Sequence, residues 1–455
     1  MSEVWENYLL QSLVIKVGSG STPKGGSEAY KAVGIPLIRS MNVIFFGFKR
    51  AGLAYIDANQ AAQLDNATVK AGDVLLNITG ASIGRVTLAP DEFEGARVNQ
   101  HVCIIRPNEA LDARFLNAYL SSPALQSQIW NDNFGVTRQA LTKQQILDFE
   151  VPVPPKAEQT RIVNQLDTLL TRVQACNDRF DAIPALLKRF RQTVLDAATT
   201  GKLTDDWRDQ GAKPWGHVRL REVASGFSYG SAAKSSKAGD VPVLRMGNIQ
   251  SGRLDWSDLV FTSDKKEIEK YKLAKGDVLF NRTNSPELVG KTAVFQGERE
   301  AVYAGYLICV RCLSQLQPEY LNYCLGSKAG REYCWSVKSD GVSQSNINAK
   351  KLAAFSFLLP ELAEQAEIVR RVEALFTLAD RIEARCTAAR AQAQRLTPLV
   401  LAKAFRGELV PQDPTEEPAS ALLARIASSN TAVARKSKQK VPVAKKKRAQ
   451  KAIHL

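Results

Sequence analysis

The sequence predicts an α+β protein in which two mixed α/β domains are separated by two long helices that pair as an antiparallel coiled coil. One observation behind this fold class is a helical stretch beginning at Pro154 that occurs a second time from Pro360. The other is that the segments preceding the two copies also match. The 455 residues have room for two or three domains. We therefore expect a pseudo-two-fold internal repeat in the order domain, helix, domain, helix.

The two helical stretches keep the same residues at one constant offset. The matched pairs at their beginnings are Pro154 and Pro360, Glu158 and Glu364, Gln159 and Gln365, Ile162 and Ile368, and Val163 and Val369. The matched pairs at their ends are Ala198 and Ala404, Gly201 and Gly407, and Leu203 and Leu409. Two helical spacers are expected, over residues 154–212 and 360–415.

Apolar residues in both stretches are spaced alternately by four and three positions, over about four to five heptads, which is typical of a coiled coil. The expected seam residues are Ile162, Leu166, Leu169, Val173, Phe180, Ile183 and Leu187 in the first helix, and Ile368, Val372, Leu375, Ile382 and Leu396 in the second. One such stripe cannot bury itself, so the two are expected to bury each other. The alternative is two amphipathic helices that pack on separate domains. Pro184 should kink or interrupt the first helix.

The first domain is expected over residues 1–153. Residues 35–42 form a predicted strand that ends in polar residues. The turn at Gly72-Asp73 leads into a second strand. A third strand is expected at 102–106 and a short helix at 111–125. A polar loop, a helical turn and a short strand then lead to the first spacer.

The second domain, over residues 213–359, repeats this frame loosely. Residues 241–245 match 35–39, and Gly276-Asp277 matches Gly72-Asp73. The intervening loops differ between the copies. Residues 416–455 are expected to be a basic and disordered tail, with a short helix at 419–427.

The net charge is +15, and the tail segment 435–451 supplies nine Lys or Arg and no acid, which leaves about +6 for the rest. A basic chain favours nucleic acid or another polyanion as its partner. The chain has no apolar run of about 20 residues and no signal-peptide pattern, so we expect a cytoplasmic protein without a membrane partner. Seven scattered cysteines argue against a disulfide framework.

Motifs for catalysis are weak. Gly290-Lys291-Thr292 resembles the end of a phosphate-binding loop, but Ser285 replaces the first glycine of that motif. Cys309 and Cys312 have the spacing of zinc ligands, although no second close pair follows and zinc needs four ligands. No Asn-Pro-Pro-aromatic or Asp-Pro-Pro-aromatic tetrapeptide is present, which argues against an amino-methyltransferase centre. A triad built on His101 stays an open alternative, and no metal site is expected.

Loops at matching places in both domains carry side chains suited to DNA. Arg and Lys bind phosphate and guanine, Asn and Gln bind adenine, and hydroxyls bind phosphate. In the first domain the candidates are Ser21, Thr22, Lys24, Arg39, Asn77, Arg85, Asn99, Gln100, Arg138 and Gln139. In the second domain they are Tyr229, Ser231, Lys234, Arg245, Asn248, Asn281, Arg282, Asn284, Ser343, Gln344 and Asn346. Each residue taken alone could equally be a solvated loop side chain or a turn cap.

Together these features resemble the specificity (S) subunits of type I restriction-modification systems, over residues 1 to about 415. The resemblance rests on the two Pro-x-x-x-Glu-Gln-x-x-Ile openings, the two Ala-x-x-Gly-x-Leu ends, and segments 72–86, 99–107 and 229–231. The sequence departs from that pattern near 303–306, where no Asn-Gln-His recurs, at the altered turn after Asn281, and in the basic tail.

The resemblance implies a non-catalytic subunit with two target-recognition domains, each of which reads one half of a bipartite, asymmetric site on double-stranded DNA. The paired helices, about 65 Å long for 43 residues, would set the spacing and dock two methyltransferase subunits. Two restriction/translocase subunits would complete the complex. This chain would hold no cofactor, whereas S-adenosylmethionine, ATP and Mg are expected in the partner subunits. The alternatives are a coiled-coil scaffold with protein-binding end domains and an enzyme that acts alone on nucleic acid.

Overall fold

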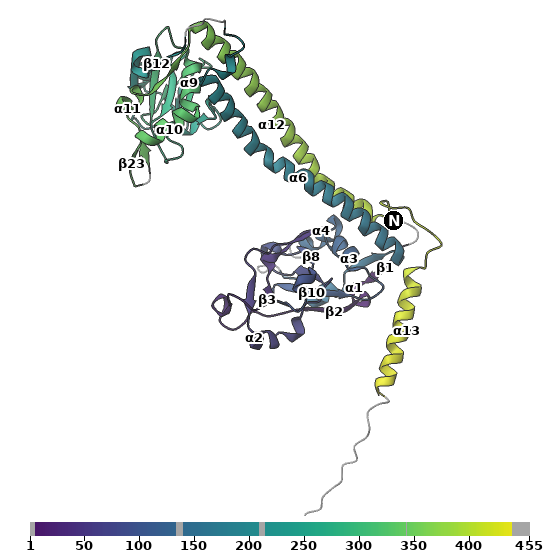
Figure 1. Ribbon diagram of the computed structural model, residues 1–455. Helices are drawn as coiled ribbons and strands as arrows, with labels where there is room; N and C mark the ends of the chain where they lie inside the picture. The colour runs from purple at the N-terminus through teal and green to yellow at the C-terminus, as the bar shows by residue number, and fades with distance from the viewer. Residues whose placement is uncertain (1–4, 133–139, 209–213, 343, 439–455) are drawn as a thin grey trace, which may run out of the picture. The chain divides into compact units, whose positions relative to one another are not determined.

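The computed structural model describes residues 5–132, 140–208, 214–342 and 344–438 (Figure 1). The chain divides into two compact units, of which unit 1 comprises Met1–Asp178 with Arg390–Leu455 and unit 2 comprises Arg179–Ala389. Helices α6 (Lys156–Thr199) and α12 (Leu362–Phe405) cross this division. Each unit therefore contains one globular domain and one end of the helix pair.

Domain 1, in unit 1, is built on a four-stranded sheet in the order β2-β10-β7-β8, whose neighbouring strands are antiparallel. A three-stranded sheet in the order β6-β3-β9 and two strand pairs, β1-β11 and β4-β5, complete it. The strands of the two larger sheets are β2 (Val14–Ser19), β10 (Val102–Pro107), β7 (Val74–Asn77), β8 (Val86–Leu88), β6 (Ala54–Ile56), β3 (Ile35–Ile38) and β9 (Arg97–Val98). The strand pairs are β1 (Glu6–Leu9) with β11 (Glu150–Val153) and β4 (Val43–Ile44) with β5 (Gly47–Phe48). The helices are α1 (Leu10–Leu13), α2 (Ala58–Ala62), α3 (Ala113–Leu120), α4 (Pro123–Asp132) and α5 (Lys143–Leu147).

Domain 2, in unit 2, repeats this plan strand for strand, with sheets β13-β22-β18-β20 and β17-β14-β21 and pairs β12-β25 and β15-β16. Domain 2 also contains the sheet β19-β24-β23, whereas the matching segment of domain 1 includes residues 133–139, which lie outside the described residues. The strands are β12 (Gly216–Arg219), β13 (Ala224–Tyr229), β14 (Val241–Leu244), β15 (Ile249–Gln250), β16 (Arg253–Leu254), β17 (Val260–Thr262), β18 (Val278–Asn281), β19 (Thr283–Asn284), β20 (Thr292–Val294), β21 (Val302–Tyr303), β22 (Leu307–Cys312), β23 (Ser339–Asp340), β24 (Ser345–Asn346) and β25 (Ser356–Leu359). The helices are α7 (Leu220–Val223), α8 (Lys265–Tyr271), α9 (Pro318–Gly326), α10 (Lys328–Val337) and α11 (Ala349–Ala353).

The repeated Gly-Asp pairs have the same structural cause in both domains. Gly72 and Gly276 have φ values of 76° and 92°, a backbone conformation that disfavours side chains with a Cβ. The following Asp73 is buried and forms an ion pair of 2.6 Å with Arg106 of β10, while Asp277 pairs with Arg311 of β22 at 3.2 Å. The turn and the ion pair together fix the beginning of β7 and of β18.

The repeated glutamines attach each domain to its helix. The buried Gln159 accepts a hydrogen bond from Asp112 N at 2.7 Å and donates to the carbonyls of Ala110 and Pro154. Gln365 makes the same set of bonds, with Gln317 N, Gln315 O and Pro360 O. One amide side chain thus satisfies three backbone groups at the beginning of α6 and of α12, which explains why this residue occurs twice.

The preceding glutamates bind a tryptophan in each unit. The Trp5 indole lies 3.3 Å from both carboxylate oxygens of Glu158. Glu364 accepts hydrogen bonds from Trp215 at 2.8 Å, Thr204 at 2.7 Å and Arg208 at 2.8 Å. Both carboxylates are buried, so these bonds replace their hydration.

The predicted antiparallel coiled coil is confirmed (Figure 1). In unit 1, Ile162 and Leu166 of α6 share a hydrophobic core with Leu401 and Ala404 of α12. In unit 2, Val194 and Ala198 share a core with Ile368 and Val372. Each pairing brings the beginning of one helix to the end of the other, which is the antiparallel arrangement.

The seam differs from the prediction at two positions. Ile382 and Leu396 are 40% and 46% exposed, whereas Ala379 and Ala393 are buried. Ala379 and Ala393 are two heptads apart and both stay buried, so one of the two alternating seam positions faces the partner helix while the other, three residues later, turns outward. The expectation that Ile382 and Leu396 lie buried between the helices is therefore wrong.

Three other elements also differ from expectation. Helix α6 continues through Pro184, so the expected interruption is wrong, while the expected kink stays a prediction. The helix predicted over 111–125 is two helices, α3 and α4, because Ser121 ends α3 and Pro123 begins α4. Helix α13 (Ala419–Lys438) is longer than the short helix expected in the tail, and residues 439–455 lie outside the described residues. In the described part of the chain, every helix is too short or too polar to cross a membrane.

Candidate nucleic-acid interface

In domain 1, polar side chains from three separate loops meet beyond one end of the four-stranded sheet. The Thr22 hydroxyl donates a hydrogen bond to the side-chain oxygen of Gln100. The Gln100 amide nitrogen lies 3.1 Å from His101 Nε2, and Thr79 Oγ1 hydrogen-bonds to His101 Nδ1. Gln100 is exposed, and this chain of bonds holds its side chain at the surface.

A hollow of about 440 Å³ adjoins this cluster, lined by Ser40, Met41, Thr79, Gly80, Ala81, Ser82, Arg85 and His101. Arg85 is exposed, and no side-chain hydrogen bond or ion pair engages it within the described residues. Its guanidinium therefore keeps its five donors for an external acceptor. Ser21 and Lys24 are exposed in the loop after β2.

That loop passes close to β9. An added Cβ on Gly20 would lie 1.8 Å from the carbonyl oxygen of Val98, and one on Gly230 in domain 2 would lie 2.3 Å from that of Tyr303. Only glycine allows such an approach. The two glycines thus place Ser21 and Lys24 in domain 1, and Ser231 and Lys234 in domain 2, at equivalent positions.

In domain 2, Arg282 is the centre of the corresponding cluster. Its guanidinium lies 4.6 Å from the centre of the Tyr229 ring and donates to Gly305 O and Asn346 Oδ1, each at 3.4 Å. Asn346 donates to Thr283 Oγ1 at 2.7 Å across the pairing of β19 with β24. Tyr229 is exposed, while Asn284 is half-buried on the same strand pair.

Arg39 and Arg245 occupy equivalent places after β3 and β14. Arg39 lies 5.2 Å from the centre of the Tyr30 ring and donates to the carbonyl oxygen of Gly52. Arg245 pairs with the exposed Asp258 at 3.1 Å. Both guanidiniums are half-buried and already hold internal partners, so external contacts would compete with these bonds.

Five of the expected DNA-binding residues are buried. Asn77 and Asn281 are fully buried in β7 and β18. Asn248 is held by the backbone of Arg245, Asp255 and Asp258. Asn99 accepts from His101 N, and Ser231 donates to Glu267 and accepts from Ala233 N.

Asn77, Asn99, Ser231, Asn248 and Asn281 are therefore engaged inside the protein, and their expected role in DNA binding stays a prediction. Arg138, Gln139 and Ser343 lie outside the described residues. Lys234 and Gln344 are exposed.

The structure adds one basic residue, Lys291, to the DNA-binding candidates taken from the sequence. Gly84 N and Gly290 N donate to Asn77 O and Asn281 O, so the turns before β8 and β20 are equivalent. Lys291 therefore stands where Arg85 stands in domain 1. Because the turn in domain 2 has a different sequence, the equivalence becomes visible only from these backbone bonds.

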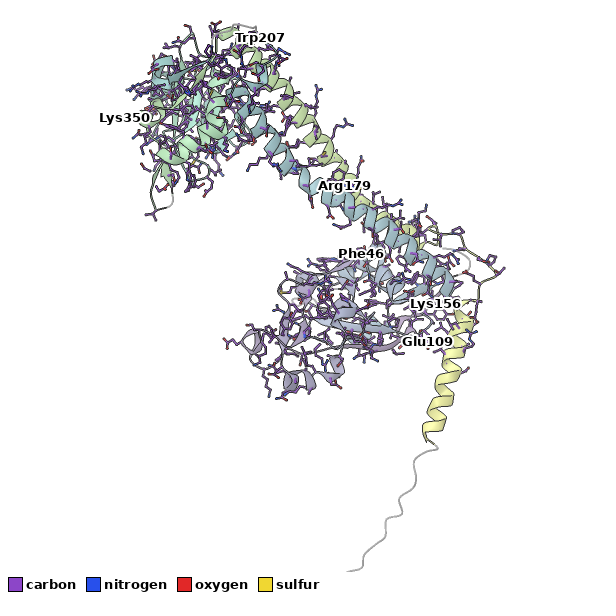
Figure 2. The ribbon with its side chains drawn as sticks, in the orientation of Figure 1. Phe46, Glu109, Lys156, Arg179, Trp207 and Lys350 are labelled. Atoms are coloured by element: carbon purple, nitrogen blue, oxygen red, sulfur yellow. The ribbon has the colours of Figure 1, made fainter. Side chains whose placement is uncertain are left out.

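The two domains differ most clearly at one hairpin. Ile44, Phe45 and Phe46 are exposed at the tip of β4–β5, where Phe46 has a φ of 55° (Figure 2). The equivalent tip of β15–β16 consists of Gln250, Ser251 and Gly252. One domain therefore presents an apolar tip and the other a polar tip.

The weak catalytic motifs do not form sites. Gly290-Lys291-Thr292 leads into strand β20, whereas a phosphate-binding loop leads into a helix whose N-terminus binds the anion. Cys309 and Cys312 lie on β22, and burial raises the pKa of the Cys312 thiol to about 12. Among the described residues, no three His, Cys, Asp or Glu side chains gather as a metal site would require.

A protein-family model described as the type I restriction modification DNA specificity domain matches residues 4–183 and 212–388. The chain is 30% identical over 416 residues to the EcoKI specificity subunit of Escherichia coli (strain K12), covering 88% of this chain and 89% of that protein. It is 32% identical over 375 residues to the EcoBI specificity subunit of Escherichia coli, covering 74% and 76%.

Two solved structures share the fold. A chain of a type I R-M system, solved for its complex assembly and conformational transition, superposes with a TM-score of 0.67 at 20% identity, over 90% of this chain and 99% of that chain. The HsdS subunit from Thermoanaerobacter tengcongensis superposes with a TM-score of 0.57 at 19% identity, over 90% and 98%.

Proposed function

Because the chain belongs to the family of type I restriction-modification DNA specificity subunits, whose members are non-catalytic and recognise DNA, we propose that its two domains read the two halves of a bipartite site. The observation that carries this proposal is the equivalence of two polar and cationic clusters. One contains Gln100 with Arg85 nearby, and the other contains Arg282, while Lys291 holds the position equivalent to Arg85. Each cluster lies beyond the same end of the four-stranded sheet of its own domain.

The two clusters differ in chemistry, which supports an asymmetric site. Domain 1 offers a glutamine amide held by a histidine, beside an apolar hairpin tip. Domain 2 offers an arginine stacked on Tyr229 and held by Asn346. Amides suit adenine, and arginine suits guanine or phosphate. The half-sites should therefore differ in sequence.

The paired helices would set the distance between the half-sites and dock two methyltransferase subunits. Exposed apolar side chains on the helices support docking. Phe190 of α6 and Leu396 of α12 occupy equivalent positions of the repeat, and both are exposed, as are Leu378 and Ile382. Apolar side chains on an outer helix face fit the burial of a partner helix.

The partner subunits would supply the chemistry. Two methyltransferase subunits would use S-adenosylmethionine on adenine, and two restriction subunits would use ATP and Mg. The base to be methylated must be flipped out of the duplex, which the specificity chain would allow by holding the flanking sequence.

Competition binding tests this function. The chain, reconstituted with methyltransferase subunits, is titrated onto labelled host DNA fragments in the presence of random competitor DNA, at several salt concentrations. We expect fragments carrying one bipartite motif to resist competition, with affinity falling as salt rises. Equal competition by random and host DNA at every salt concentration would leave the alternative, a coiled-coil scaffold with protein-binding end domains.

A further inference from the structure

A second basic hollow lies in unit 2, between domain 2 and the two helices. Its volume is about 450 Å³, and its lining includes Lys188 of α6, Lys291 and Arg331 of domain 2, and Glu373 and Glu383 of α12. Arg191 and Arg253 also line it. Five cations and two carboxylates therefore surround one cavity.

The acidic side chains of this hollow are already paired. Arg191 bonds Asp380 and Glu383, each at 2.8 Å, and Arg253 bonds Asp380 at 2.8 Å and Glu373 at 3.4 Å. These pairs use Arg191 and Arg253. They leave the positive charges of Lys188, Lys291 and Arg331 without a carboxylate partner in the described part of the chain.

Lys291 has donors to spare. Its ammonium donates to Gln250 Oε1 at 3.2 Å, which uses one of three hydrogens. Burial lowers the pKa of Lys291, and the nearby positive charge of Arg331 lowers it further. A bound anion would offset both effects. Arg331 donates to the carbonyls of Val289 and Glu287, which fixes its guanidinium beside the turn that carries Lys291.

We propose that this hollow binds a phosphate of the DNA backbone through Lys291, with Lys188 and Arg331 as supporting cations. Three unmatched cations suit a phosphate group, and the lysine takes the position that Arg85 holds in domain 1. The inference rests on the proposed function, because it assigns a backbone contact beside the half-site read by domain 2. A backbone contact fixes register and carries no sequence information.

The test compares Lys291→Met and Lys188→Met with the wild-type chain in the complex with methyltransferase subunits. Equilibrium binding to the specific fragment and to random DNA is measured between 50 and 200 mM salt. Loss of one phosphate contact should reduce the slope of log K against log salt by about 0.9, so the fall in affinity between 50 and 200 mM salt should be about 3-fold smaller. Binding to the specific fragment and to random DNA should weaken by the same factor, so the ratio of the two affinities should stay constant.

Two control variants accompany these. Lys291→Arg keeps the charge and should retain most of the slope. Lys275→Met removes an exposed lysine at the opposite end of the β18–β20 strand pair and should leave the slope unchanged. Lys188 lies exposed on α6, so its variant tests the hollow even if Lys291→Met unfolds domain 2.

An unchanged slope in both Lys→Met variants would overturn the inference. So would a loss confined to the specific fragment, because that would make Lys291 a base contact. A wild-type complex without sequence preference would instead contradict the proposed function, while a reduced slope in the variants would still support the phosphate site.

A free nucleotide could supply the same phosphate chemistry. Calorimetric titration of ATP into the chain, with and without Lys291→Met, separates the two sources. If ATP does not bind and Lys291→Met reduces the salt slope of DNA binding, the hollow binds a phosphate of the DNA backbone. ATP binding that requires Lys291, together with an unchanged DNA slope, would assign the hollow to a nucleotide.

Discussion

Glu158 and Glu364 occupy equivalent positions at the beginning of α6 and α12, but their surroundings shift their pKa values in opposite directions. Burial raises the pKa of Glu158, and among the described residues its hydrogen-bond donor is the Trp5 indole. Burial acts on Glu364 too, but hydrogen bonds from Thr204, Arg208 and Trp215 outweigh it and lower its pKa. The same repeated residue is therefore an ionised anchor in unit 2 and a weakly solvated carboxyl in unit 1.

The substitution Glu364→Gln should destabilise unit 2 by about 2 kcal/mol at pH 7, because hydrogen bonds to a charged acceptor are lost. Glu158→Gln should change stability by less than about 1 kcal/mol, because the Trp5 indole is the one donor to its carboxylate in the described part of the chain. Thermal unfolding of the two variants beside the wild-type chain measures the difference. An equal loss in both would contradict the account of these anchors.

The effect of Glu364→Gln should also depend on pH. A carboxyl whose folded-state pKa is lowered contributes stability above its ordinary value of 4.5 and loses it as pH falls through the folded-state pKa. The gap in melting temperature between variant and wild type should therefore be full at pH 6–7 and shrink below 4.5. A gap that stayed constant to pH 3 would show that ionisation of Glu364 is not involved.

The sequence did not predict which polar residues of the candidate site are buried and which are exposed. Asn248 and Gln100 are both polar residues in loops near predicted strands, yet Asn248 is buried as a turn cap and Gln100 is exposed. Which of these outcomes occurs depends on the neighbouring loops, which have no sequence pattern of their own. Residue type and position alone therefore cannot separate the contacts that hold the loops from those available to DNA.

Asn248→Ala should consequently act on folding and leave sequence preference unchanged. The variant loses three hydrogen bonds and leaves the backbone N–H of Arg245 and the carbonyl of Asp255 without their Asn248 partner, at a cost of about 1–3 kcal/mol. Arg85→Ala is the matched comparison, since Arg85 is exposed and should affect DNA affinity with little change in stability. If the folded Asn248→Ala protein prefers a different half-site, Asn248 takes part in DNA recognition.

At the scale of elements, the sequence predicted the helix pair and its antiparallel direction because the apolar pattern repeats in register. It did not predict which of the two alternating apolar positions faces the partner helix, since heptad spacing alone does not separate them. The buried positions in the second helix include Ala379 and Ala393, where small side chains let the helices approach closely. Ile382 and Leu396 turn outward and become available to a partner.

Ala379→Leu should therefore destabilise unit 2 by about 1–3 kcal/mol, because it inserts a larger side chain into a closely packed interface. Ala388→Leu, at an exposed position of the same helix, is the control and should be nearly neutral. Chemical denaturation followed by circular dichroism compares the two variants. Equal stability would mean that the helices do not pack closely at Ala379.

At the scale of the whole molecule, the order of domain, helix, domain and helix was predictable because each unit is repeated along the chain. The strand-for-strand match of domain 1 and domain 2 follows from shared turns, ion pairs and helix anchors. The two hairpin tips had no repeated sequence and could not be predicted. Those unrepeated parts are where the two domains can differ in what they bind.

If the helix pair sets the spacing between half-sites, lengthening both helices should lengthen the gap. Inserting one heptad into α6 and one opposite it in α12 adds about 10.5 Å, or about three base pairs. Selection of bound sequences from a random DNA library reports the gap. A heptad inserted into α6 alone breaks the pairing and should abolish binding, and an unchanged gap in the double insertion would remove the spacing role.

The proposed function requires the two domains to read separate half-sites of one DNA motif. A map of adenine methylation tests this most directly, in DNA exposed to the complex formed by this chain and its methyltransferase subunits. We expect one asymmetric motif with two short specified segments separated by an unspecified gap. A single contiguous motif, a palindrome, or methylation without sequence preference would contradict it.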